Sequence, residues 1–291
     1  MIIRDPDMVT EAALAAVARA SDQRHAEIMS ALVRHLHAFL RDVRLTDAEL
    51  ETAFDFANRI GQATTDSHNE AALFSDVLGA STLVCLLNNG MTGPTETGAA
   101  LLGPFWRLNA PEMENGASLL RSPTPGTPLD VSGQVRDARG APIEGVRVDV
   151  WHASPVGLYE SQDPEQADMN LRGVFKTDAD GRFQFHTVRP LGYPVPTDGP
   201  TGEVLRAQRR QPNRPAHLHF LLYREGFRTL ITQVFPDDDP HLAEDPVFGV
   251  TPALIGDFVV SGRGTPDERC ALMCNFTLEA GTARLPTPPI K

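Results

Sequence analysis

The sequence predicts a mainly β protein with an α-helical N-terminal part: a helical region over residues 1–100, followed by a β-sandwich over residues 101–291. Two observations lead to this fold class. From about Met8 to Asn88, apolar residues recur at i, i+3, i+4 and i+7, which is the period of amphipathic helices. From about Leu129 onward, short alternating or β-branched runs are separated by turn sequences such as DARG, DADG and SGRG, as in sandwiches and related closed sheets.

The helical signal is clearest in two segments, DQRHAEIMSALVRHLHAFLRDV and ETAFDFANRIGQA. Before the second, Thr46 and Glu49 have the spacing of a capping box, in which a hydroxyl and a carboxylate satisfy amides of the first turn. Residues two apart diverge by about 200° around a helix, so His35 and His37 cannot clamp one ion. We assign these two histidines to the surface or to an interface.

Eight short runs are expected to form the strands of the β region. They are VSGQV, RVDVW, GVFKT, RFQFHTV, AHLHFLLY, TLITQVF, DFVVSG and LMCNFTLE. Their β-branched or alternating composition fits strands, and the Gly- and Asp-rich peptides between them fit turns.

The composition excludes some partners and locations. The 291 residues carry a formal net charge of −12, which argues against a nucleic-acid partner because phosphate contacts need a basic surface. No apolar run is long enough to span a membrane and the first residues lack a signal-peptide core, so we expect no membrane partner and a cytoplasmic protein. Cys85, Cys270 and Cys274 fit a reducing compartment and are interpreted as packing residues.

The segment RPAHLHF, from Arg214 to Phe220, is the first indication of a site. Its alternation places His217 and His219 on one face of a strand, and the intervening Leu218 on the other. The two histidine Cα atoms are then about 6.5–7 Å apart, so both rings could reach one ion. An isolated pair of this kind is more often a solvated strand face or a bonded pair of core histidines, and the pattern alone leaves both interpretations open.

Oxygen donors for such an ion are sought among the three tyrosines. Tyr159 lies in VGLYES and Tyr193 in the stiff loop RPLGYPVPTDGP, whereas Tyr223 lies about 13 Å along the strand from His219 and is a poor candidate. Phenol has an ordinary pKa near 10, so only a strong Lewis acid such as Fe(III) holds it ionised at neutral pH. Zinc with two histidines more often recruits Cys or a carboxylate. Each tyrosine could equally be a packed ring with a bonded hydroxyl.

Taken in order, GLY, GYPVP, RPAHLHF and ITQVF resemble the motifs of the intradiol ring-cleavage dioxygenases, ferric enzymes that open catechols between their two hydroxyl-bearing carbons. The resemblance runs from about Glu70 to Phe248 and includes SDVLG, GPFW, DVWHASPVGLYE and GVFKTDADGRFQF. It implies that residues 101–291 form a catalytic domain and that residues 1–100 form a linker through which two copies dimerise. Some members of the family hold a lipid between those helices.

The same resemblance implies a set of site residues. One non-haem Fe(III) per subunit would be bound by Tyr159, Tyr193, His217 and His219. Arg214 and Gln233 would flank the substrate ring as catalytic residues, and Tyr193 would leave the metal and take a proton when the diol binds. The substrate would lie against residues of two segments, namely Leu73, Asp76, Leu101, Gly103, Pro104 and Phe105.

The resemblance also implies that the substrate is a small aromatic diol or triol, with O2 as the second reactant. Leu73 and Asp76 are three apart and share a helix face, and Asp76 could accept a hydrogen bond from a third ring hydroxyl or could instead cap a helix start. Within the family, SDVLG and GYPVPTDGPTGE are most similar to the enzymes that convert hydroxyquinol (1,2,4-trihydroxybenzene) to maleylacetate. The alternative is cleavage of catechol or chlorocatechol to a cis,cis-muconate.

Two hypotheses of other classes are weighed against this one. A non-catalytic carrier or adhesion module would leave the histidine face and both loop tyrosines unexplained. Extradiol cleavage would need Fe(II) bound by two histidines and one carboxylate, and no Asp or Glu is placed as well as the tyrosines.

Overall fold

The structure is a computed structural model that describes residues 2–66, 68–89 and 97–290. The chain divides into two compact units, Met1–Asn58 and Arg59–Lys291. The first unit is helical and the second contains all the strands of the described residues. The helical N-terminal part and the β-rich remainder are therefore confirmed, while the proposed domain boundary at residue 100 stays a prediction.

The first unit contains α1 (Pro6–Val17), α2 (Gln23–Val43) and most of α3 (Asp47–Ala63). The expected capping box is present: the Glu49 carboxylate accepts the Thr46 N–H at 2.8 Å, and the Thr46 hydroxyl accepts the Glu49 N–H at 3.4 Å. An apolar stripe follows α2 at helical spacing, and its side chains are 47–53% exposed: Ile28, Leu32, Leu36, Phe39 and Val43. About half of each of these apolar side chains is therefore left exposed.

Three further helices belong to the second unit: α4 (Glu70–Val77), α5 (Ala80–Asn89) and α6 (Pro200–Ala207). Asn69 caps α4 by accepting the Ala72 N–H at 2.9 Å. In the part of the chain that the structure describes, no single helix is long and apolar enough to cross a membrane. Only α4 and α5 taken together have the length and apolar composition of a membrane span, and they are bent by 74° at the break between them.

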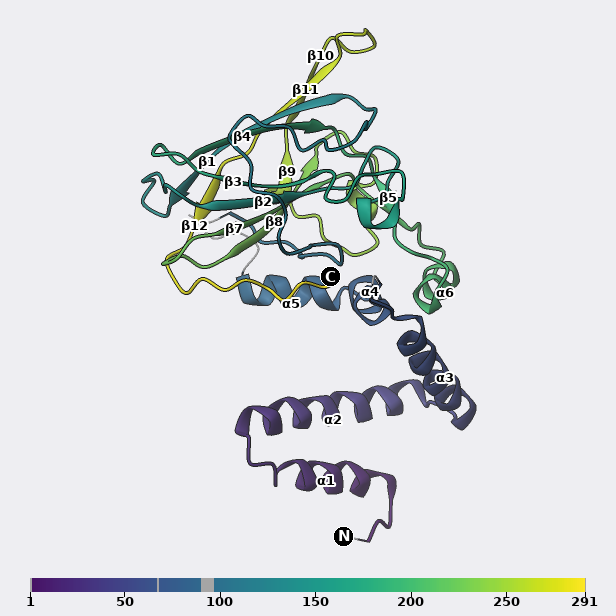
Figure 1. Cartoon of the computed structure of the whole chain (residues 1–291). Coiled ribbons are helices and arrows are strands. Elements are labelled where there is room, and N and C mark those ends of the chain that lie inside the picture. Colours follow the sequence, from purple (N-terminus) through teal and green to yellow (C-terminus); the bar gives the residue numbers. More distant parts are fainter. Residues whose placement is uncertain (1, 67, 90–96, 291) are drawn as a thin grey trace. The chain divides into compact units, whose positions relative to one another are not determined.

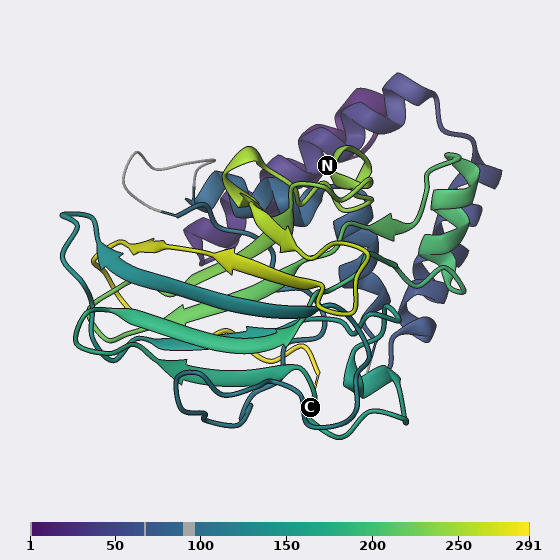
Figure 2. The same ribbon diagram turned by 90° about the horizontal axis from the view of Figure 1, so that it is seen from above.

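Two five-stranded sheets form the body of the second unit. The first contains β1 (Pro128–Asp137), β4 (Arg182–Val188), β10 (Phe258–Ser261), β11 (Arg269–Met273) and β12 (Phe276–Leu278). The second contains β2 (Arg147–Trp151), β3 (Arg172–Lys176), β7 (Leu218–Tyr223), β8 (Leu230–Pro236) and β9 (Ile255–Gly256). Figure 1 shows the first sheet above the second, with α4 and α5 below the second; Figure 2 shows β1 running between β4 and β11.

The core between the two sheets follows the predicted alternation. Leu218, Phe220 and Leu222 point inward from β7 and are fully buried against side chains of the other sheet. Phe220 packs against Phe183 and Phe276 at ring-centroid distances of 6.4 and 5.0 Å. His217 and His219 therefore point to the outer face of the second sheet, as their register with the apolar residues requires.

The segment LMCNFTLE was predicted to form one strand, but in the structure it is divided between two short strands. Cys274 and Asn275 separate β11 from β12, and both short strands pair in parallel with β1. The Cys274 N–H donates to the Ser132 carbonyl at 2.9 Å, and the Asn275 side chain accepts the Gln134 N–H at 3.1 Å. A Cβ at Gly133 would lie 1.9 Å from the Cys274 carbonyl oxygen, so the close approach at this break depends on glycine.

Candidate active site

The two histidines of HLHF meet at the outer face of the second sheet. His219 is paired with Gln233 of β8 on one side and with Trp151 of β2 on the other. His217 immediately precedes β7, and its Nε2 lies 3.1 Å from the Nε2 of His219. Trp151 stacks on the His219 ring at 4.7 Å with an interplanar angle of 8°, which fixes the ring plane.

Both predicted tyrosines reach the same place from separate segments. Tyr159 follows β2 and immediately precedes a 3-10 turn, Glu160–Gln162. Tyr193 belongs to a two-residue strand, β5 (Tyr193–Pro194), which pairs with β6 (Asn213–Arg214). The two hydroxyl oxygens lie 3.4 Å apart, and the Tyr193 ring lies 5.7 Å from the His217 ring. Tyr223 does not take part; its hydroxyl donates to Glu225.

The donor atoms of these four residues suit a cation. Burial, followed by the nearby Arg214 charge, lowers the pKa of His217 to about 3, so its imidazole is neutral. Nδ1 of His217 lies 2.8 Å from the Pro215 carbonyl, which assigns the proton to Nδ1 and leaves a lone pair on Nε2. Burial also lowers the pKa of His219 well below its ordinary value. Both imidazoles are therefore neutral, and the Nε2 of His217 carries no proton.

The phenols need a positive partner before they can ionise. Burial, reinforced by the Tyr193 phenol, raises the pKa of Tyr159 well above its ordinary value of 10.0. A buried phenolate is unfavourable unless a nearby cation compensates for the lost hydration. The chemistry of this donor set, two phenols and two neutral imidazoles, therefore fits a trivalent metal ion.

The LLGPF segment packs directly on these residues. Gly103 has φ +74°, and a Cβ there would lie 3.1 Å from Cε1 of His219. Phe105 stacks on Tyr159 at 4.4 Å. The Leu101 carbonyl accepts the Gln233 side-chain amide at 2.7 Å. The predicted substrate residues of this segment, Pro104 included, thus lie in a stretch of chain that contacts the four-donor cluster.

Arg214 lies beside the cluster and forms an ion pair with Asp245. It is 5% exposed, and its Nη1 lies 3.3 Å from Nε2 of His217. Its Nη2 donates to Gln233 Oε1 at 3.3 Å. Burial disfavours the guanidinium charge, but Asp245 outweighs that effect and raises the pKa of Arg214. The two predicted catalytic residues therefore contact each other at the edge of the donor cluster.

The sequence interpretation missed two buried carboxylates that support the site. Asp245 pairs with Arg214 from 31 residues away. Glu160 accepts from Arg172 at 2.7 Å, and both side chains are 1% exposed. Arg172 also donates to the Phe105 carbonyl at 2.6 Å, so it links the segment of Tyr159 to that of Phe105. Only the position of Glu160 next to Tyr159 could have pointed to this pair.

One wall beside the site is apolar, and Asp76 lies at its edge. The cluster consists of Leu73, Val77, Val195, Leu205 and Val247, with Leu101 packed against it. Asp76 belongs to the last turn of α4, and the start of that helix is capped by Asn69. The interpretation of Asp76 as a helix-start residue is therefore wrong. Burial raises the pKa of Asp76, while a Ser81 hydrogen bond and the Arg214 charge oppose that effect. The Asp76 carboxyl is thus close enough to Arg214 for their charges to interact.

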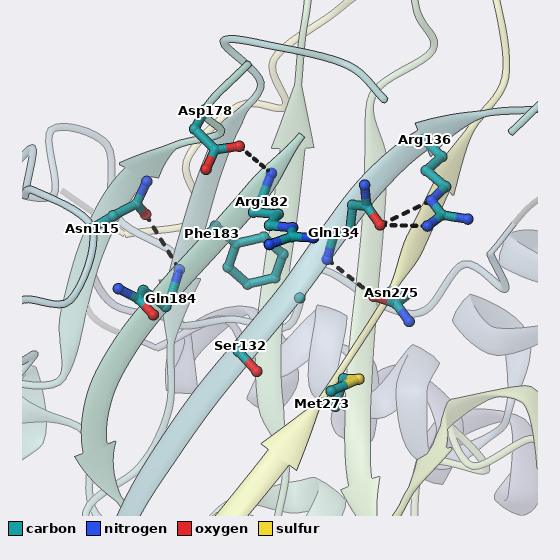
Figure 3. Close-up of a pocket in the computed structure, with 11 residues that line it drawn as sticks. Asn115, Ser132, Gln134, Arg136, Asp178, Arg182, Phe183, Gln184, Met273 and Asn275 are labelled. Atoms are coloured by element: carbon teal, nitrogen blue, oxygen red, sulfur yellow. Dashed lines mark hydrogen bonds between the residues drawn. The ribbon is translucent and has the colours of Figure 1, made fainter. Parts of the chain in front are cut away.

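A separate hollow of about 600 Å³ lies on the outer face of the first sheet (Figure 3). Two of its polar side chains form hydrogen bonds with backbone amides of the sheet: Asn275 accepts the Gln134 N–H and Asn115 accepts the Gln184 N–H. None of the predicted site residues lines this hollow, and it plays no part in the site.

Carboxylates do not complete the histidine pair. Within residues 2–66, 68–89 and 97–290, no group of three or more His, Cys, Asp or Glu side chains could hold a metal ion. The two-histidine, one-carboxylate set that extradiol cleavage requires is therefore missing from the described residues. The oxygen atoms that lie beside the histidine pair belong instead to Tyr159 and Tyr193.

Comparison with known proteins agrees with this geometry. The family model "Catechol dioxygenase N terminus" matches residues 22–94, and the model "Dioxygenase" matches residues 101–280. Hydroxyquinol 1,2-dioxygenase of Rhizobium sp. (strain MTP-10005) is 42% identical over 250 residues, which cover 85% of this chain and 84% of that protein. 6-Chlorohydroxyquinol 1,2-dioxygenase of Cupriavidus pinatubonensis is 42% identical over 265 residues, covering 90% and 94%.

Solved structures show the same relationship over almost the whole chain. The hydroxyquinol 1,2-dioxygenase of Pseudomonas putida DLL-E4 superposes with a TM-score of 0.87 at 35% identity, covering 94% of this chain and 98% of that one. The family resemblance of the motifs is thereby confirmed, and the carrier hypothesis is set aside. The chain belongs to the intradiol ring-cleavage dioxygenase family.

Proposed function

We propose that this enzyme binds one non-haem Fe(III) per subunit through Tyr159, Tyr193, His217 and His219, and that it cleaves hydroxyquinol with O2 to give maleylacetate. The observation that carries the proposal is the convergence of two phenols and two neutral imidazoles in one buried cluster. The names of the two relatives at 42% identity support a hydroxyquinol-type substrate. The reaction balances without a further reductant, because both atoms of O2 enter the ring-opened diacid.

Bound Fe(III) would supply Lewis-acid activation of the chelated diol. The residues of the chain would do the rest. Tyr159 remains the anionic oxygen donor, and the Tyr193 oxygen takes a proton from a substrate hydroxyl. The Arg214 guanidinium stabilises negative charge that develops on the opening ring, and Gln233 holds Arg214 through its Oε1.

The alternative substrate is catechol or a chlorocatechol, with a cis,cis-muconate as product. One observation favours keeping it: the catechol 1,2-dioxygenase of Pseudomonas arvilla C-1 superposes with a TM-score of 0.81 at 28% identity, covering 95% of this chain and 93% of that one. The backbone that positions the donor cluster is thus compatible with either substrate.

Oxygen uptake measured in parallel with hydroxyquinol, catechol and 4-chlorocatechol tests the proposal. We expect hydroxyquinol to give the highest kcat/KM, with maleylacetate identified as the product. Phenolate bound to Fe(III) absorbs visible light, so the purified protein should be wine-red to purple, and its band should shift when a diol is added without oxygen. A colourless protein that contains stoichiometric zinc and consumes no oxygen would contradict the proposal.

Asp76 is expected to select for the third ring hydroxyl. Asp76→Ala should lower the ratio of kcat/KM for hydroxyquinol to kcat/KM for catechol by about 10- to 100-fold, because a hydrogen bond to a charged group contributes about 1.5–3 kcal/mol. The value for catechol alone should change little. A variant that keeps the wild-type ratio would remove Asp76 from substrate selection and would leave the cleavage reaction itself unaffected.

We also propose a homodimer formed through the N-terminal helices, with a lipid held between them as in some family members. The half-exposed apolar stripe of α2 supports an apolar partner for this helix.

A further inference from the structure

The Arg214 guanidinium has three partners from three separate elements, and only one of them is charged. Asp245 binds it in a bidentate manner, with Nε to Oδ1 at 3.1 Å and Nη2 to Oδ2 at 3.2 Å. Gln233 and His217 lie 3.3 Å from Nη2 and Nη1. A planar guanidinium held at both edges has one orientation. Asp245 is 5% exposed, so water competes little for its carboxylate.

The turn that follows Asp245 keeps this carboxylate in place. The Gly249 N–H donates to Oδ2 at 2.9 Å and the Val247 N–H to Oδ1 at 3.4 Å. Phe248 has φ +56°, an unfavourable backbone angle for a residue other than glycine. A Cβ at residue 249 would lie 3.0 Å from Asp245 Oδ2 and 3.2 Å from Arg214 Nη2. The strained turn and Gly249 therefore allow the backbone to approach the Arg214–Asp245 ion pair closely.

Contacts from other elements hold the turn itself. The Arg210 guanidinium lies 4.7 Å from the Phe248 ring centroid and donates to the Pro246 carbonyl at 2.6 Å. It also donates to the Val77 carbonyl at the end of α4, at 2.8 Å. The Thr82 hydroxyl of α5 donates to the Val247 carbonyl at 2.7 Å. Such outlying support for one strained turn is expected where a functional group must be fixed.

We propose that Asp245 is a positioning residue for ring cleavage, which acts through Arg214. It fixes the guanidinium plane beside the donor cluster, and it compensates part of the Arg214 charge. A fully uncompensated Arg214 would bind the anionic diol tightly before the reaction, which does not lower the barrier. The inference rests on the proposed function, because it needs Arg214 to face a diol undergoing cleavage.

The test is Asp245→Asn, measured with hydroxyquinol and with catechol. We expect kcat to fall about 100-fold, since a misplacement of about 1 Å can cost that much. The dissociation constant of either diol, measured under argon from the visible band, should stay the same or decrease, because Arg214 then carries its charge uncompensated. A merely structural role would weaken diol binding and turnover together. Asp245→Glu, which keeps the charge, should recover about tenfold of the lost kcat.

A double-mutant cycle shows whether Asp245 acts through Arg214. In an Arg214→Gln background, Asp245→Asn should change kcat/KM by less than about threefold, because the two side chains form one unit. This comparison stays informative if Asp245→Asn alone folds poorly, since the double variant buries no unpaired charge. Asp238→Asn is the matched control: this half-exposed carboxylate pairs with Arg189, and the variant should keep wild-type kcat.

The outcomes separate this inference from the proposed function. Wild-type kcat in Asp245→Asn, or losses that multiply in the double variant, would overturn the inference while cleavage by the wild type still supports the function. A wild-type protein that cleaves neither diol would overturn the proposed function, and this inference with it.

Discussion

Replacing His219 with alanine is expected to remove the bound iron and the visible absorption band, and to lower kcat/KM with hydroxyquinol by more than about 100-fold. Loss of a group that only orients a metal ligand typically costs 10- to 100-fold, so loss of a ligand should cost more. His219 is well placed for this test, because its Nε2 lies 3.1 Å from that of His217. Trp151 fixes its ring, and the side chain is 1% exposed.

The measurements are iron content per subunit, the visible spectrum and oxygen uptake. His186→Ala serves as the control, because His186 is an exposed histidine of β4 that pairs with Asp130 at 2.6 Å, outside the donor cluster. It should keep its iron, colour and kcat/KM. A His219→Ala protein that retains stoichiometric iron and the wild-type band would show that the metal, if bound, is held elsewhere.

The parts of this molecule that local sequence determines were predictable. The alternation in HLHF fixed which face each side chain takes, because a strand has a period of two and the apolar residues must face the core. The capping box at Thr46 could also be predicted, because its two partners are only three residues apart in the sequence. Donor chemistry made Tyr159 and Tyr193 candidates, but only the family resemblance joined them to the histidines, because no spacing rule brings two distant loops together.

Features that depend on long-range pairing were not predictable. Asp245 and Arg214 are 31 residues apart, and no spacing rule links a turn to the strand it meets. The break between β11 and β12 at Cys274 lies where the chain closely approaches Gly133 of β1, a contact that LMCNFTLE alone does not reveal. The sequence left open whether Asp76 caps a helix start or contacts the substrate, but the helix begins at Glu70, where Asn69 supplies the cap. In the first two cases a tertiary contact decided the outcome.

Replacing Arg214 with glutamine is expected to lower kcat/KM by about 100- to 1,000-fold, the usual cost of removing one group that stabilises developing negative charge. Iron content and the visible band of the resting protein should persist, because Arg214 is not among the four donors. This result would separate Arg214, as a group that acts on the substrate, from the metal-binding residues tested by His219→Ala.

Arg214→Gln should also destabilise the fold, because it removes the charged partner of Asp245. Burial raises the pKa of Asp245, but the Arg214 charge and the Gly249 N–H lower it below its ordinary value. Without Arg214, the carboxylate is left buried and unpaired, which costs about 3–5 kcal/mol. For a unit of this size, that corresponds to a drop in Tm of roughly 6–20 °C.

Arg214→Gln combined with Asp245→Asn should recover most of that Tm, because neither residue then buries a charge, while kcat/KM stays low. Thermal unfolding followed by circular dichroism and oxygen uptake on the same samples give the two readouts. Recovery of both together would mean that the loss of activity came from unfolding. Recovery of Tm alone would mean that cleavage needs the guanidinium itself at this position.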